Sequence, residues 1–170
     1  MSTPAANQPG LRPVPDGSDP QPLKVFCGHC GRSPEKQQPV ETTNARVCQK
    51  CGMGLLLQAP ADAAPSPTDP FMVIDSSLTV CAVSKHAERL LSINETDAVN
   101  RHIGEFLVPG DAETSPNENL AALVTWAARG DAPQRDVVVR PTNTFGVRYW
   151  ARIGPCGPPT AALLVLADAG

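Results

Sequence analysis

The sequence predicts an α+β protein in two parts: a small cysteine-bound β-hairpin module, then a five-stranded antiparallel sheet with helices on one face. Three observations predict this class. Two C-x2-C pairs lie near each other in the first third of the chain. Proline-rich stretches separate that region from its surroundings. The last hundred residues show two strand patterns, a helical middle and three further strand patterns, an order that favours one sheet with helices packed on one side.

Composition sets the broad class of the 170-residue chain. Hydrophobic residues make up 41% but aromatic residues only 4%, and there are 19 prolines, which indicates folded parts diluted by disordered ones. The formal charge of −3 argues against a nucleic-acid-binding surface along the whole chain, because phosphate contacts need clustered Lys and Arg. We find neither a signal-peptide pattern nor an apolar run long enough to cross a bilayer. We therefore expect a cytoplasmic protein without membrane contact.

Four segments follow along the chain. Residues 1–22 contain six prolines and few large apolar side chains, so they cannot bury enough surface to fold and are predicted to be a disordered tail. Residues 23–58 hold the cysteine module. Residues 59–69 form a Pro/Ala-rich linker without large apolar side chains, and residues 70–170 form the larger domain.

The two cysteine pairs carry the clearest chemistry. Cys27 and Cys30 are followed after seventeen residues by Cys48 and Cys51. A C-x2-C turn lets two thiolates converge on one metal ion, and each pair is followed by a glycine that supplies the backbone freedom of such a turn. The spacer suits a β-hairpin that brings the pairs together, and the spacing predicts a structural four-thiolate zinc site. Metal binding would then fold this module, which has few apolar side chains.

The segments "CGHCG" and "CQKCG" resemble the two knuckles of the zinc ribbon family over about 35 residues. Three other readings of the cysteines are open. A redox pair needs one C-x2-C in a βαβ setting, and a cysteine nucleophile with His29 as base needs a scaffold and a pocket. A catalytic zinc needs an open coordination position, which four thiolates do not leave. We expect His29 to be an exposed knuckle residue rather than a ligand.

The domain over 70–170 is predicted element by element. Short β-branched runs at 71–75 and 78–83 flank Ser76–Ser77 as in a hairpin. Apolar periodicity then predicts three helices, over 84–93 with Ser84 as N-cap, over 95–104, and over 117–129 before Gly130. Three strands complete the chain, at 135–140, 145–153 and 161–167.

The strand at 145–153 alternates in polarity. Its apolar side chains are expected to face the core: Val147, Tyr149, Ala151 and Ile153. The opposite side carries Arg148, Trp150 and Arg152, a basic and aromatic face that we interpret as a candidate partner surface. An ordinary solvent-facing strand is the alternative.

The segment "FMVIDSSLTVCAVSKHAERLL" resembles the opening of a PAS domain, with Asp75 ending the first strand and an A-x-x-L-L helix stripe at Ala87, Leu90 and Leu91. The segment "VNRHIGEFL" is similar to a later element of the family, with Gly104 in place. The resemblance implies a sensory or interaction domain that contacts a protein partner, forms a homodimer, or holds a small molecule in a pocket between helices and sheet.

The same resemblance allows cofactors other than zinc to be weighed. The cysteine-containing stretch of flavin-binding members has no counterpart here, and the helix at 117–129 lacks the histidine that usually binds haem. His86 and His102 are the remaining haem-ligand candidates, with helix capping or solvent exposure as the favoured reading. We interpret Cys81 as an inert buried thiol and Cys156, in "GPCGPP", as an exposed loop thiol.

We find no P-loop, kinase, cyclase, HExxH or G-x-S-x-G motif and assign no catalytic residue. The sequence therefore favours a non-enzymatic regulatory or signalling protein, a zinc ribbon joined to a PAS-like domain. The alternative is a transcription-associated regulator in which the ribbon contacts nucleic acid and the PAS-like domain dimerises or senses a ligand.

Overall fold

The structure is a computed structural model that describes residues 21–35, 46–110, 119–130 and 133–169. The predicted disordered tail, residues 1–22, lies outside the described residues apart from its last two. In the described ranges, no helix is both long enough and apolar enough to span a membrane.

A small two-stranded sheet frames the cysteine module. Strand β1 (Leu23–Cys27) pairs antiparallel with β2 (Leu56–Pro60), in a register that places Leu23 opposite Pro60 and Cys27 opposite Leu56. The paired strands precede the first cysteine pair and follow the second, while residues 36–45 of the spacer lie outside the described residues. The module boundary expected at residue 59 falls inside β2.

The main sheet is antiparallel throughout, in the order β4-β3-β8-β7-β6-β5. Its strands are β3 (Phe71–Ile74), β4 (Val80–Val83), β5 (Leu107–Pro109), β6 (Arg135–Pro141), β7 (Tyr149–Cys156) and β8 (Ala161–Asp168). Five strands were predicted, and the α+β class with an antiparallel sheet is confirmed. The sixth strand, β5, is a three-residue edge strand beside β6.

Between β4 and β6, the described residues form four short helical elements: α1 (Lys85–Leu91), α2 (Glu95–Ala98), the 3-10 turn η2 (Ile103–Glu105) and α3 (Leu120–Ala128). The single helix expected over 95–104 is wrong. Val99 has an extended backbone and Asn100 a φ of 69°, so the chain leaves the helix and resumes as η2. Gly130 follows α3 with a φ of 75°, as a glycine at that position does.

Ser84 joins α1 to the sheet. As predicted, it caps α1, and its hydroxyl accepts the N–H of Ala87 at 3.2 Å. The same oxygen accepts the N–H of Phe71 in β3 at 2.9 Å. Because Ser84 is buried, its hydroxyl satisfies two backbone donors that water cannot reach.

The main core lies between the sheet and the helices. Met72 of β3 and Leu164 of β8 contribute to it from the sheet, and Val124 from α3. The predicted alternation of β7 is confirmed, because Tyr149, Ala151 and Ile153 are buried there and Val147 packs against them.

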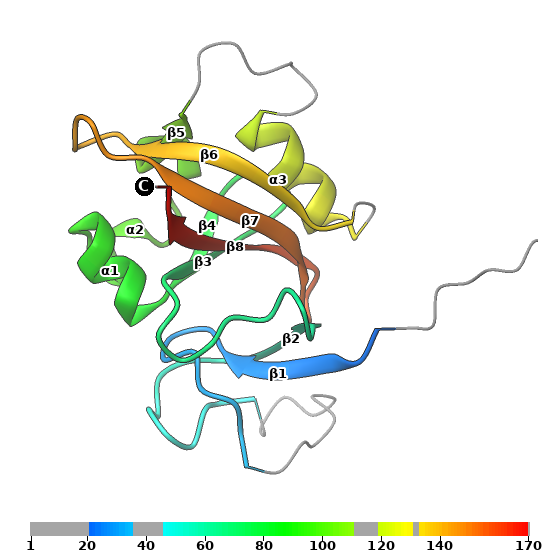
Figure 1. The fold of residues 1–170 in the computed structure, drawn as a ribbon. Coiled ribbons are helices and arrows are strands. Elements are labelled where there is room, and N and C mark those ends of the chain that lie inside the picture. The colour runs from blue at the N-terminus through cyan, green and yellow to red at the C-terminus, as the bar shows by residue number, and fades with distance from the viewer. Residues whose placement is uncertain (1–20, 36–45, 111–118, 131–132, 170) are drawn as a thin grey trace, which may run out of the picture.

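A second apolar cluster, called here the outer cluster, covers the opposite face of the sheet. The cysteine module supplies Phe26, Leu57 and Ala59, and the sheet supplies Phe71, Val73, Cys156, Ala161, Leu163 and Val165. The rings of Phe26 and Phe71 meet edge to face, with centroids 5.6 Å apart and planes at 88°. The sheet is therefore covered on both sides, by helices and by the cysteine module (Figure 1).

The segment between the two parts is folded against the sheet. After β2, the N–H of Ala63 donates to the carbonyl of Pro60 at 2.9 Å, and the N–H of Ser66 donates to the Asp69 carboxylate at 2.8 Å. Ala63 is buried, and its carbonyl accepts from the Arg152 guanidinium at 3.5 Å. The segment that was expected as an extended linker therefore forms turns and contacts the sheet.

Candidate metal centre

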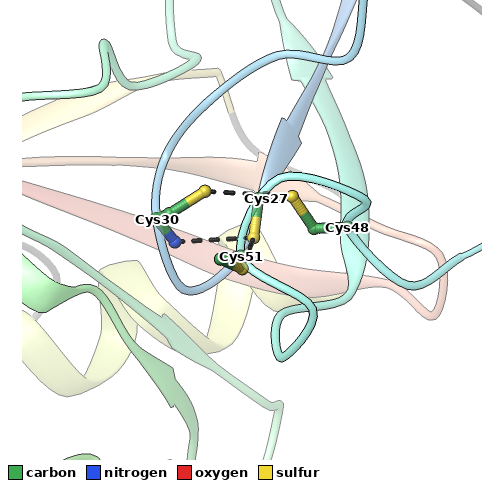
Figure 2. A group of neighbouring side chains, drawn as sticks. All are labelled: Cys27, Cys30, Cys48 and Cys51. Atoms are coloured by element: carbon green, nitrogen blue, oxygen red, sulfur yellow. Dashed lines mark hydrogen bonds between the residues drawn. The ribbon is translucent and has the colours of Figure 1, made fainter.

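The four predicted cysteines meet at one point. Their sulfur atoms all lie within 4.8 Å of one another, with Cys27 and Cys51 3.6 Å apart and Cys30 and Cys48 3.9 Å apart. Zinc–sulfur bonds of about 2.3 Å place the sulfurs of a tetrahedral site about 3.8 Å apart. The spacing is compatible with zinc. Figure 2 shows the two pairs converging from two separate loops.

Each pair sits on a tight turn closed by the glycine that follows it. Gly31 donates its N–H to the carbonyl of Cys27 at 3.0 Å, and Gly52 donates to that of Cys48 at 2.9 Å. Both glycines have positive φ angles, 71° and 68°. The two turns repeat one geometry, which is why the same short motif occurs twice in the sequence.

Backbone N–H groups point at the sulfurs. Cys27 Sγ accepts from His29 at 3.3 Å and from Cys30 at 3.4 Å, and Cys51 Sγ accepts from Gly54 at 3.4 Å. Hydrogen bonds of this kind stabilise negative charge on sulfur. They orient the sulfurs of Cys27 and Cys51 towards the centre of the cluster.

Gly54 allows the two loops to approach each other. A Cβ atom at this position would lie 2.2 Å from Cys27 Sγ and 2.7 Å from the Cβ of His29. The spacing of the cysteines does not reveal this requirement, since Gly54 stands outside both C-x2-C motifs.

The protein environment shifts the pKa values of Cys27, Cys30 and Cys51 in different directions. Burial raises the pKa of Cys27 and Cys30 above the ordinary value. Burial acts in the same direction on Cys51, but the N–H groups of Gly54 and Met53 and the neighbouring thiols outweigh it and lower the pKa to about 6. Four thiolates together therefore require the charge of a cation.

His29 is not the exposed residue that the sequence suggested. Its side chain is only 15% exposed, and its Nδ1 lies 3.5 Å from Oε1 of Glu95 in α2. Its carbonyl accepts the N–H of Lys85, the first residue of α1, at 3.0 Å. The expectation was wrong because the knuckle packs against the larger domain, which the spacing of the cysteines does not encode.

The predicted partner surface is only partly exposed. Trp150 lies on the outward side of β7 and is 48% exposed, and Arg148, just before this strand, is exposed as well. Arg152, two residues on, is half-buried beside Ala63 and its Nε has no hydrogen-bond partner among the described residues. The three residues therefore do not form one free face.

The two remaining cysteines show the opposite of their expected exposure. Cys81 is exposed because β4 is an edge strand of the sheet. Cys156 is buried in the outer cluster, and burial raises its pKa to about 12. Both earlier interpretations were wrong. The helix-capping reading of His102 is confirmed, since its Nδ1 accepts the N–H of Gly104 at 2.9 Å.

The elements of residues 71–168 follow the order two strands, short helical elements with β5 among them, and a three-stranded meander. No protein-family model matches the chain, and no curated protein matches its sequence. Solved structures do show similarity. The PAS domain of an HTR-like protein from Haloarcula marismortui is 17% identical with a TM-score of 0.45, over 59% of this chain and 85% of that one.

Two further structures are similar. The PAS domain of nitrogen regulation protein NR(II) from Vibrio parahaemolyticus is 15% identical with a TM-score of 0.42, over 59% of this chain and 89% of that one. The E. coli DhaR(N)–DhaL complex contains a chain that is 18% identical with a TM-score of 0.39, over 60% of this chain. In that case the match spans only 32% of the other chain.

Proposed function

We propose that the chain is a non-enzymatic regulatory or signalling protein, in which a structural zinc ribbon covers one face of a PAS-like domain that contacts a protein partner. The observation that carries this proposal is the outer cluster. Phe26 and Leu57 of the ribbon pack on Phe71 and Val73 of the sheet. The metal-bound module therefore shapes the outer surface of the sheet domain. A binding domain whose surface is shaped by such a module is suited to regulation through contact with a protein partner.

The ion is zinc in a closed site. Four thiolates complete a tetrahedral shell and leave no position for water or substrate, which is the arrangement of structural rather than catalytic zinc. Metal analysis of the purified full chain should give one zinc per chain. Cys48→Ser should lower this ratio, while Cys81→Ser, which alters a cysteine outside the cluster, should not. Equal zinc content in both variants would overturn the assignment.

The partner contacts the outward side of β7. Trp150 is partly exposed beside Arg148, and Trp and Arg are the residue types that most often dominate binding energy at protein interfaces. Trp126 on α3 offers a matched control, because it is another tryptophan of similar exposure, 40% against 48%.

The experiment compares proteins captured from the native cell by the full chain, Trp150→Ala and Trp126→Ala. A partner retained by Trp126→Ala and reduced about tenfold or more by Trp150→Ala supports the proposal. Identical capture by all three overturns the assigned surface. Duplex DNA binding whose log-affinity falls linearly with log salt would instead favour the nucleic-acid-binding regulator.

A further inference from the structure

A groove lies between the loops of the cysteine module and part of the outer face of the sheet. Its volume is about 330 Å³, within the range of small-molecule sites. The apolar walls come from both parts of the chain, with Met53, Leu55 and Leu57 from the module and Val73, Ala82 and Ala161 from the sheet. This position is on the other side of the sheet from the core between sheet and helices, where the PAS resemblance implies a ligand.

His29 and Glu95 both line this groove, and their side chains lie close together without a hydrogen bond between them. Glu95 Oε1 lies 3.5 Å from His29 Nδ1, and that buried nitrogen has no hydrogen-bond partner among the described residues. The other carboxylate oxygen of Glu95 is held by the N–H of Val83 at 2.8 Å. Oε1 therefore keeps its capacity to accept a hydrogen bond.

The charges that line the groove are mainly negative. Asp75 and Glu95 contribute two carboxylates against the single guanidinium of Arg46, which donates to the carbonyl of Pro158. Together these three side chains carry one net negative charge. Such a lining attracts a cation and repels an anion, more strongly where apolar walls exclude water.

We propose that this groove binds a small, largely apolar molecule with a primary amine, whose ammonium donates to Glu95 Oε1 and whose apolar part contacts Leu57, Val73 and Ala82. An ammonium has three donors, one of which suffices for Glu95 Oε1. The site stands on its own geometry and does not depend on the proposed regulatory role. Because its walls come from both parts, a bound molecule contacts the ribbon and the sheet at once.

Three fluorinated probes of the same ring size test the charge preference on the zinc-loaded full chain. They are 4-fluorobenzylamine, 4-fluorobenzyl alcohol and 4-fluorobenzoate, titrated by fluorine NMR at pH 7. We expect the amine to bind about tenfold more tightly than the alcohol, since a hydrogen bond to an ionised group is stronger than a neutral one, and the benzoate to bind least. Equal binding of amine and alcohol, tighter binding of the benzoate, or no binding of any probe overturns the proposal.

A variant pair locates the charge. Glu95→Gln removes the carboxylate but keeps an oxygen that can accept the N–H of Val83. It should abolish the preference for the amine over the alcohol. Glu105→Gln removes an exposed carboxylate in η2 that does not line the groove, and should leave the preference unchanged. Loss in both variants, or in neither, contradicts the assignment to Glu95.

Cys81 locates the site in the unaltered protein. This exposed thiol lines the groove, whereas Cys156 is buried. Saturating 4-fluorobenzylamine should slow alkylation of Cys81 by iodoacetamide severalfold, as followed by mass spectrometry of the Cys81 peptide. An unchanged rate at a probe concentration that saturates the NMR signal would place the amine elsewhere and overturn the proposal.

Discussion

The substitution Phe26→Ala tests whether the ribbon and the sheet form one folding unit. Phe26 is completely buried in the outer cluster, and its ring meets that of Phe71 edge to face. Removing a buried phenylalanine side chain costs about 3–5 kcal/mol of unfolding free energy. About 0.5–1.5 kcal/mol of this belongs to the aromatic pair. If the ribbon were an independent module on a flexible linker, the substitution would leave the unfolding free energy of the sheet domain unchanged.

Urea unfolding followed by tryptophan fluorescence separates the two cases. Both tryptophans, Trp126 and Trp150, lie in the sheet domain, so the signal reports on that domain alone. We expect Phe26→Ala to lower the stability measured there by about 3–5 kcal/mol. Leu23→Ala, in the same strand but 57% exposed, should change it by less than about 0.5 kcal/mol.

The double variant with Phe71→Leu measures the contact directly. The cycle of Phe26→Ala, Phe71→Leu and the pair should show a coupling of about 0.5–1.5 kcal/mol. A sheet transition that is insensitive to Phe26→Ala, together with zero coupling, would refute the docked arrangement.

Four further predictions address individual residues. Gly54→Ala should weaken zinc binding at least about tenfold against a chromophoric chelator, because its Cβ would lie 2.2 Å from Cys27 Sγ; unchanged affinity would contradict the packing. Ser84→Ala should lower the unfolding free energy in urea by about 1–3 kcal/mol, since it leaves buried backbone donors unsatisfied, and a neutral result would contradict the cap. At pH 8, iodoacetamide should alkylate Cys81 but not Cys156, as read by peptide mass spectrometry. Burial raises the pKa of Cys156 from 9.0 to about 12, so its neutral thiol should stabilise the fold below pH 9 and lose this contribution towards pH 12. The difference in urea midpoint between wild type and Cys156→Ala should therefore shrink between about pH 9 and about pH 12.

Local chemistry made the metal site predictable. Two C-x2-C turns encode their own geometry, because the glycine after each pair closes the turn and the thiols need only a common ion. The order of strands and helices was equally local, since periodicity and the Ser84 cap act within a few residues. The break after Ala98 was missed because it depends on the left-handed backbone of Asn100, which a helical pattern does not reveal.

Contacts between the two parts were not predicted, although the sequence carried a signal for them. Strand β8 is buried from Ala161 to Leu166 without alternation, and β3 is buried at all four residues. A continuous apolar strand indicates a sheet that is covered on both faces. The helices cover one face, so the other required a cover, and the cysteine module was the remaining candidate. The burial of His29 and Cys156 follows from that cover and could not be judged without it.

Metal binding and coverage of the outer sheet face are linked, since one module serves both. The binding free energy of a structural zinc ion in a small module is about 10–16 kcal/mol at neutral pH. A single large docking contact such as Phe26 contributes about 3–5 kcal/mol. The proposed zinc ion would therefore dominate the order of the module, and the docking contacts would decide where the ordered module lies. The linkage is reciprocal: a ligand that needs the outer face uncovered must weaken metal binding by the factor by which the metal weakens that ligand. A ligand that contacts Leu57 of the ribbon and Glu95 of the larger domain at once strengthens metal binding instead. The sign of a ligand's effect on zinc affinity therefore shows whether it displaces the ribbon or binds between the ribbon and the larger domain.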